Sequence, residues 1–225
     1  MRFNSVLPIA AAAVSIAMTT AVKPVSAFTV GFGNITTNNG TNSSAVSGQF
    51  TADITSIASG VQVLFKNAGL IASSIAEIYF DDQKGLLSAL APSGISPSAG
   101  VEWETGANPG SLPSQNTANP PFNTTSILSS QASGNNQTGI NPGESLILRF
   151  ALSGSNTFSG VQDAFGTGAL RIGLHVRAIG GAGSDSYVSN PNAVPEPFTI
   201  VGSGVALGVG AMMRKKQQKK EKSIG

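Results

Sequence analysis

The chain has 225 residues, of which only 11% are charged, and its 27 glycines and 12 prolines favour short strands and turns over helices. The formal net charge of +2 comes from lysines and arginines near the C-terminus, whereas acidic residues outnumber basic ones between residues 28 and 193. This mildly acidic body argues against nucleic acid as a partner, and the absence of cysteine excludes disulfides, thiolate metal sites and cysteine nucleophiles.

The N-terminus has the three-part layout of a secretory signal peptide. Arg2 precedes an apolar stretch (residues 6–18), and the small-residue triplet VSA ends at Ala27. This order predicts export by the general secretion machinery and cleavage by signal peptidase after Ala27, which would remove residues 1–27. The alternative is a buried N-terminal helix, which the two prolines within residues 8–24 disfavour because proline interrupts the helical hydrogen-bond ladder.

Five segments of the body alternate apolar and polar residues with a period of two. They read GQFTADITSI, GVQVLFKNAG, SIAEIYFDD, ESLILRFAL and ALRIGLHVRAIG. The period predicts antiparallel strands with one buried and one wet face, because successive side chains of a strand point to opposite sides. Before the fourth segment, Asn141-Pro142-Gly143 is typical of a type II turn, in which proline fixes φ and glycine supplies a positive φ.

One segment, TFSGVQDAFGTG, has helical spacing instead. Phe158, Val161 and Phe165 recur as on one helix face, and we expect the helix to end at Gly166. Many short strands with one short helix predict a mainly β fold for residues 28–183, an antiparallel two-layer β-sandwich of jelly-roll type.

Two segments of the body are polar and lack a clear period. Residues 105–143 are mostly Asn, Ser, Pro, Gly and Thr, and a loop of this length is uncommon inside a compact domain. We expect either a mobile surface excursion or a segment that contains short strands. Residues 184–193 are expected to be a polar linker.

The C-terminus combines an apolar stretch with a basic tail. Residues 198–213 carry no charge, and residues 214–222 begin with Arg214, Lys215 and Lys216. The stretch spans about 24 Å as a helix, somewhat less than the roughly 30 Å of the hydrocarbon core. It is interpreted as a C-terminal transmembrane helix with its tail in the cytoplasm, the alternative being a buried core helix.

A short extended motif precedes this stretch, because the prolines in Val194-Pro195-Glu196-Pro197 oppose helix and sheet. The motif, the apolar stretch and the basic residues together resemble the PEP-CTERM sorting signal (residues 194–222). This resemblance implies an exosortase, a membrane-embedded processing enzyme, as a partner. The phrases AEIYFDD, INPGESLILRF and LRIGLHVRAIG also resemble ectodomains of other PEP-CTERM proteins, which implies no particular activity.

The single histidine, His175, is the only imidazole base for a Ser-His-Asp site. The alternation places it with Arg171 and Arg177 on one strand face, which we expect to be exposed and polar. The alternative is a shallow patch for anionic sugars, in which the arginines bind carboxylate or sulfate and Trp103 and Tyr79 supply aromatic surface.

Two acidic groups have an alternative chemical interpretation. Glu102 and Glu104 flank Trp103 at a spacing that overlaps that of inverting glycosidases, although carboxylates two apart are common on solvated strands. Asp81 and Asp82, with Tyr79, have oxygen ligands for calcium, against which we weigh a turn or capping role.

The sequence therefore predicts an exported, membrane-anchored surface or extracellular-matrix protein with a non-enzymatic ectodomain and no catalytic residues, cofactor or metal. The first alternative is a carbohydrate-binding module for exopolysaccharide, and the second is a secreted glycoside hydrolase.

Overall fold

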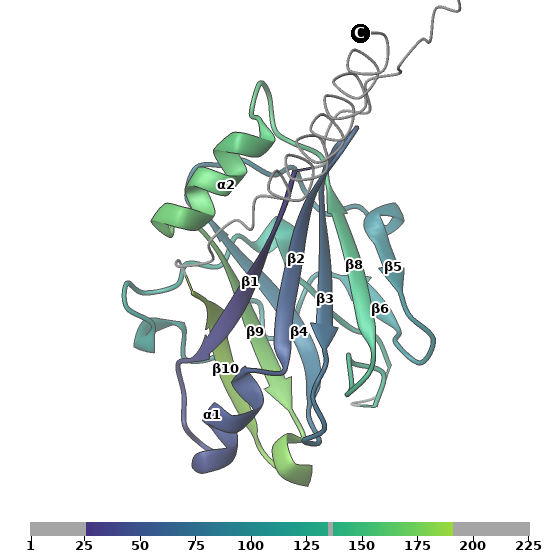
Figure 1. The fold of residues 1–225 in the computed structure, drawn as a ribbon, viewed down its shortest axis with the longest axis vertical. Coiled ribbons are helices and arrows are strands. Elements are labelled where there is room, and N and C mark those ends of the chain that lie inside the picture. The colour runs from purple at the N-terminus through teal and green to yellow at the C-terminus, as the bar shows by residue number, and fades with distance from the viewer. Residues whose placement is uncertain (1–25, 135–136, 191–225) are drawn as a thin grey trace, which may run out of the picture.

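In a computed structural model of the chain, the described residues are 26–134 and 137–190. Ten antiparallel strands form one sheet that curls until its two halves face each other (Figure 1). The strands are β1 (Ala27–Asn34), β2 (Phe50–Ile57), β3 (Gly60–Asn67), β4 (Ser74–Asp82), β5 (Ile95–Pro97), β6 (Trp103–Thr105), β7 (Ser130–Ala132), β8 (Ser145–Phe150), β9 (Leu170–Arg177) and β10 (Ser184–Ser189). The helices are α1 (Thr41–Ser47) and α2 (Phe158–Thr167), with 3-10 turns η1 (Pro92–Gly94), η2 (Gln115–Thr117), η3 (Ser126–Leu128) and η4 (Ile179–Gly181).

Strand β1 joins the two halves of the sheet. Its residues 27–31 pair with β2, and its residues 32–34 pair with β10. The strand order is therefore β5-β8-β3-β2-β1-β10-β9-β4-β7-β6. The outermost strands, β5 and β6, lie close together, so the sheet is nearly closed into a barrel.

The interior of this near-barrel is filled by aromatic and aliphatic side chains from both halves. The Phe80 ring on β4 meets the Phe150 ring on β8 with 4.9 Å between centroids, and Phe50 on β2 meets Tyr187 on β10 at 5.3 Å. Both pairs are edge-to-face, the arrangement that aromatic quadrupoles favour. These contacts fix the distance between the two halves.

Helix α2 closes the core beside the first residues of β1. Phe158 and Phe165 pack against the ring of Phe28, at centroid distances of 6.0 Å and 5.4 Å. The helix continues past the predicted end at Gly166 and stops at Gly168, whose φ of 75° is the left-handed conformation of a helix C-cap. The helix itself is confirmed, but its predicted end is wrong by about one half-turn.

The period-two segments are confirmed as β2, β3, β4, β8 and β9, and the mainly β, antiparallel class is confirmed with them. The predicted turn is confirmed as well, because Glu144 N–H donates to Asn141 C=O and Gly143 has a φ of 88°. No period in the sequence predicts β1, β5, β6, β7, β10 or α1, whose segments are short, polar or rich in glycine.

The predicted linker at residues 184–193 is wrong for its first six residues. Ser184–Ser189 form β10, which lies between β1 and β9 and is almost entirely buried. Polar residues are stable there because both neighbouring strands satisfy the backbone.

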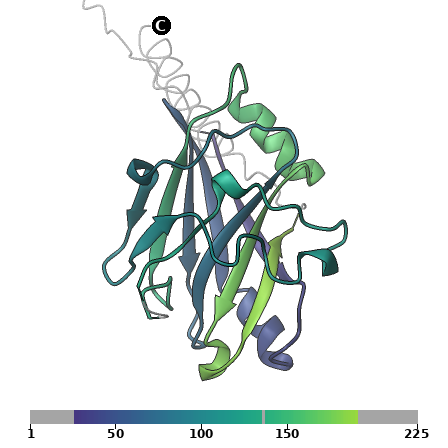
Figure 2. The same ribbon diagram turned by 180° about the vertical axis from the view of Figure 1, so that it is seen from behind.

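The long polar segment, residues 105–143, is not a mobile excursion but contains short elements, the second of the two expectations. It includes η2, η3 and β7, and it crosses the outer face of β4, β9 and β10 as the teal chain of Figure 2. Leu112 and Phe122 from this segment pack on the sheet, and a Cβ at Gly173 of β9 would stand only 2.8 Å from Leu112 Cδ2. Only glycine at this position allows such a close approach.

Because this segment covers the outer face, the prediction of one solvent-exposed face is wrong for β4 and β9. All nine residues of β4 are buried, and seven of the eight residues of β9 are buried. We call residues 106–125 the covering loop.

Asp185, on β10, organises the connection between β1 and α1. Its carboxylate accepts hydrogen bonds from Thr36 Oγ1, Asn38 N–H, Asn39 Nδ2 and Ser43 Oγ, at 2.6–2.8 Å. Burial by itself raises the pKa of Asp185, but these four donors hold it below its ordinary value of 3.8. The ionised carboxylate is thus the form that the fold stabilises.

Replacing Asp185 by Asn should lower the free energy of unfolding at pH 7 by about 2 kcal/mol. The NH2 group of asparagine replaces one carboxylate oxygen, and it cannot accept the hydrogen bonds that this oxygen accepts from the surrounding donors. A folded pKa below 3.8 means that the stabilisation exists above that pH and is lost as the pH falls through the folded pKa. Urea unfolding of the unaltered protein and the Asp185→Asn variant between pH 7 and pH 2 measures the difference in their free energies of unfolding. Asp53→Asn, on a partly exposed ion pair with Lys66, is the control, and a pH-independent Asp185→Asn difference would contradict the prediction.

The predicted signal peptide lies outside the described residues, apart from its last two. The predicted sorting signal at residues 194–222 and its transmembrane helix also lie outside them. Between residues 26 and 190, excluding 135–136, no helix is long and apolar enough to cross a membrane.

Candidate functional site

Arg171, on β9, fastens the covering loop to the sheet. Its guanidinium donates from Nε and Nη2 to Asp81 Oδ2, from Nη1 to Pro120 C=O at 2.7 Å, and from Nη2 to Pro121 C=O. It also lies over the Phe122 ring, 5.3 Å from the centroid. The side chains of Arg171 and Asp81 are 6% and 2% exposed. This guanidinium therefore binds the protein's own backbone, in place of the anionic sugar that we considered from the sequence.

A second polar cluster crosses the outer face of four strands. The register places Glu104 of β6 opposite Gln131 of β7, Gln131 opposite Glu77 of β4, and Glu77 opposite His175 of β9. Glu77 Oε2 lies 2.6 Å from His175 Nδ1, while Glu77 Oε1 accepts from Arg177 Nη2. Gln131 Nε2 donates to Glu104 Oε1 at 2.7 Å. We call these five side chains the polar row.

A cavity of about 170 Å³ opens beside the polar row. Glu77, Gln131 and Arg177 line it, together with Asn108 from the covering loop. Gln131 Oε1 also accepts the Asn108 N–H at 2.8 Å, so the same residue joins the row to the loop.

The Glu77–His175 pair has the geometry of an oriented imidazole, and Ser186 is the hydroxyl residue to compare with a nucleophile. Ser186 of β10 lies opposite His175 in the register. It is buried, and among the described residues no hydrogen bond joins its hydroxyl to the imidazole. A nucleophile and its base must be within hydrogen-bond reach. Glu77 and His175 form a buried pair that joins β4 to β9.

The five residues of the predicted sugar patch do not form one exposed face. Glu77 brings His175 and Arg177 together, but Arg171 pairs with Asp81 instead. We call Arg171, Asp81 and the two proline carbonyls that Arg171 bonds the clamp. Tyr79 is fully buried, donates from Oη to Pro109 C=O, and has its pKa raised above the usual range by burial. Trp103 packs partly buried against the core. The predicted exposure was wrong because the sequence does not show that the covering loop lies on this face.

The other acidic candidates have structural partners or lie in solvent. Glu102 and Glu104 are both exposed, and Glu104 is held by Gln131. Asp82 Oδ2 accepts a hydrogen bond from the Leu87 N–H at 2.9 Å and so stabilises the turn after β4. This is the turn role that the sequence offered as the alternative to calcium binding. The described residues contain no group of three or more acidic, histidine or cysteine side chains placed to hold a metal.

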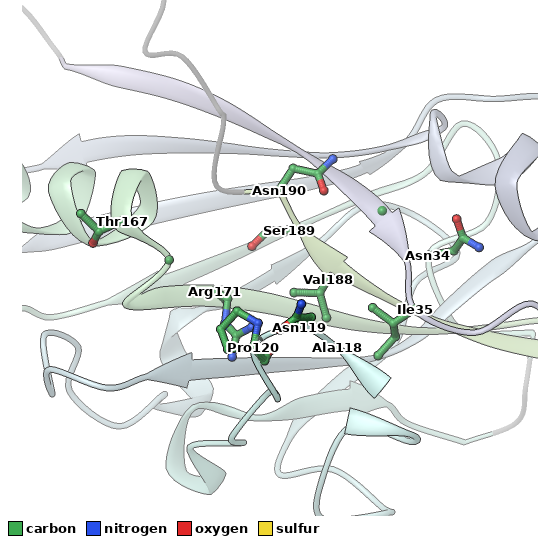
Figure 3. A pocket seen from close by; sticks show the side chains of 12 residues that line it. Asn34, Ile35, Ala118, Asn119, Pro120, Thr167, Arg171, Val188, Ser189 and Asn190 are labelled. Carbon is green, nitrogen blue, oxygen red and sulfur yellow. Dashed lines mark hydrogen bonds between the residues drawn. The ribbon is translucent and has the colours of Figure 1, made fainter. Parts of the chain in front are cut away.

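A larger groove, of about 240 Å³, lies where β1, β10, α2 and the covering loop meet (Figure 3). The amides of Asn34, Asn119 and Asn190 line it from three different elements, with Thr167 from the end of α2 and the buried Ser189. Sequence reasoning missed this groove because its residues are up to about 150 positions apart and share no spacing. Its neutral amides and hydroxyls suit a neutral polar ligand better than an anion.

Replacing Arg171 by Met should destabilise the protein by about 3–5 kcal/mol, because it leaves the buried Asp81 carboxylate without its cation. It should also release the covering loop, so that limited proteolysis cuts within residues 106–125 under native conditions. Denaturant unfolding and mass spectrometry of the fragments measure both effects. Arg149→Met is the matched control, because the partly exposed Arg149 bonds only to Gln62 among the contacts described. Equal free energies of unfolding for the two variants would contradict the role that we assign to Arg171.

Comparison with known proteins leaves the chain without a match: no protein-family model, no curated protein and no solved structure is similar to it. The functional proposal therefore rests on the residues of this chain, namely its terminal motifs, the clamp, the polar row and the groove.

Proposed function

We propose that this chain is an exported, membrane-anchored protein of the cell surface or extracellular matrix, processed at its C-terminal motif by an exosortase. Its folded body, which we class as a jelly-roll-like β-sandwich, is non-enzymatic. The support from the sequence is the order of the motif, the apolar stretch and the basic tail within residues 194–222.

The observation that carries the proposal is the direction of the two end strands: β1 starts at one end of the barrel, and β10 runs toward that same end. β1 begins at Ala27, and β10 runs antiparallel to it, with Ser189 opposite Phe32. After Asn190 the chain is therefore directed toward the end of the barrel at which β1 starts. In Figure 1 that end is at the top, while α1 lies at the bottom. A body tethered at this rim presents the α1 end away from the membrane.

The clamp and the polar row support a structural role for the body's reactive side chains. Arg171, His175 and Arg177 each have a carboxylate partner within the sheet, at Asp81 or Glu77. These pairs hold the covering loop and the strands together, which suits a stable displayed domain.

Replacing Pro195, Glu196 and Pro197 together by Ala should block processing, because three alanines permit the helix that the prolines oppose. We expect the variant to keep its C-terminal residues and remain in the inner-membrane fraction. The unaltered protein should lose the residues after the motif and leave that fraction. Cell fractionation with intact mass measurement checks this in the host, and Glu221→Ala in the tail is the control. An unaltered protein that keeps both ends and stays in the cytosol would overturn the proposal.

The groove favours one refinement, a module that binds exopolysaccharide. The amides of Asn119 and Asn190 line one cavity and can donate to and accept from sugar hydroxyls, whereas Asn34 Nδ2 already donates to Thr36 C=O. Arg171 also lines this groove, but its guanidinium is already engaged by Asp81 and the proline carbonyls.

On this refinement, Asn119→Ala and Asn190→Ala should each weaken binding of a neutral polysaccharide by about tenfold, the effect of losing one or two hydrogen bonds. Isothermal titration against the host's own polysaccharide measures it. Asn116→Ala on the exposed η2 turn, outside the groove, should bind like the unaltered protein. If the polysaccharide fails to bind, the refinement is wrong while the surface-protein proposal stands.

A further inference from the structure

The groove of Figure 3 combines apolar and hydrogen-bonding surface in one small space. Ala118 and Val188 line it from the small core beneath the covering loop, and Ile35 packs against that core. The amides of Asn119 and Asn190 line the same groove, and the view in Figure 3 shows Val188 between them. A ligand that matches this lining has an apolar group next to hydrogen-bonding groups.

The amides of Asn119 and Asn190 have no hydrogen-bond partner among the described residues. Asn34 Nδ2 and Thr167 Oγ1, which also line the groove, already donate to backbone carbonyls. An asparagine amide carries both donors and an acceptor. It is therefore best satisfied by a ligand group that also has both.

A buried hydroxyl adds a further donor to the groove. Ser189 is 5% exposed, and its Oγ accepts a hydrogen bond from the Ile172 N–H at 2.9 Å. Because the oxygen is the acceptor in that bond, the hydroxyl hydrogen is left to donate. None of the residues between 26 and 190 that the structure describes accepts a hydrogen bond from Ser189 Oγ. A carbonyl oxygen of a ligand in the groove fits this donor.

The volume and the charge of the groove restrict the ligand further. The volume is about 240 Å³, below the roughly 300–1,000 Å³ of pockets that enclose a drug-sized ligand. The Arg171 guanidinium is engaged by Asp81 and the proline carbonyls, and no carboxylate is among the described residues that line the groove. The groove therefore suits one neutral residue of a longer chain.

We propose that the groove binds an N-acetylhexosamine residue. The acetamido methyl group packs on Ile35 and Val188, its N–H and C=O pair with the asparagine amides, and Ser189 donates to the carbonyl oxygen. An O-acetyl group offers the methyl and the carbonyl without an N–H, and an unsubstituted hexose offers hydroxyls without a methyl. The inference rests on the sugar-binding refinement of the proposed function, and it names the sugar class.

Matched sugar pairs test the substituent directly. N-acetylglucosamine and glucose, N-acetylgalactosamine and galactose, and N-acetylmannosamine and mannose each differ only at C2. We expect at least one N-acetylhexosamine to bind the purified full chain at least about tenfold tighter than its parent hexose, the effect of one methyl contact and one further hydrogen bond. Titration followed by saturation-transfer NMR measures each Kd. Equal Kd values within all three pairs, or no binding of any N-acetylhexosamine, would overturn the inference.

Two variants place the sugar in this groove. Ile35→Thr removes apolar surface and should weaken the N-acetylhexosamine by about threefold while leaving the parent hexose unchanged. Ile127→Thr is the matched control, because Ile127 is 59% exposed on η3, outside the groove. Asn119→Asp keeps the shape of an exposed side chain but removes its donors, and it should weaken the N-acetylhexosamine by about fivefold. A preference for the acetylated sugar that is the same in both groove variants would overturn the assignment.

The outcomes separate this inference from the proposals on which it rests. If the parent hexoses bind as tightly as the acetylated sugars, the inference is wrong while the polysaccharide refinement stands. If no neutral sugar binds, the inference and the refinement are both wrong. The surface-protein proposal is decided separately, by processing in the host.

Discussion

A buried guanidinium holds the outer layer of this protein on its sheet. Arg171 neutralises Asp81 across two strands and donates to two consecutive carbonyls of the covering loop. A charge taken out of water is tolerated only when it is paired and hydrogen-bonded, and here both conditions are met within one side chain. Together with Leu112 and Phe122, which are buried against the sheet, this fixed point holds the covering loop over β4, β9 and β10.

The covering loop in turn changes the chemistry of the face beneath it. An exposed strand face with a histidine and two arginines would attract anions, but under the loop the same residues find carboxylates of their own. Glu77 links His175 to Arg177, and Gln131 links Glu104 to the loop backbone. The residues that looked most reactive are thus the ones that connect strands. A set of neutral polar side chains lies elsewhere, in the groove among β1, β10 and α2.

The position of β1 bears on the tether that we propose for this body. This strand belongs to both halves of the sheet, and the last described strand runs antiparallel to it, toward the end of the barrel at which β1 starts. Only four residues separate Asn190 from Pro195. Since an extended residue reaches at most about 3.6 Å, the processing that we propose would take place near the folded body.

The sequence by itself determined the elements whose information is local. The period-two segments, the Asn141-Pro142-Gly143 turn and the α2 helix follow from which neighbours are apolar and which backbone angles proline and glycine allow, and the two terminal motifs are likewise read from consecutive residues. Only the tertiary structure decided the rest. β10 is a strand because β1 and β9 flank it, although its own residues are mostly polar. The covering loop is ordered through the distant Arg171 and Gly173, and the groove collects asparagines from three separate elements. Such contacts join residues tens of positions apart, and no spacing along the chain encodes them, because they depend on how the whole sheet curls.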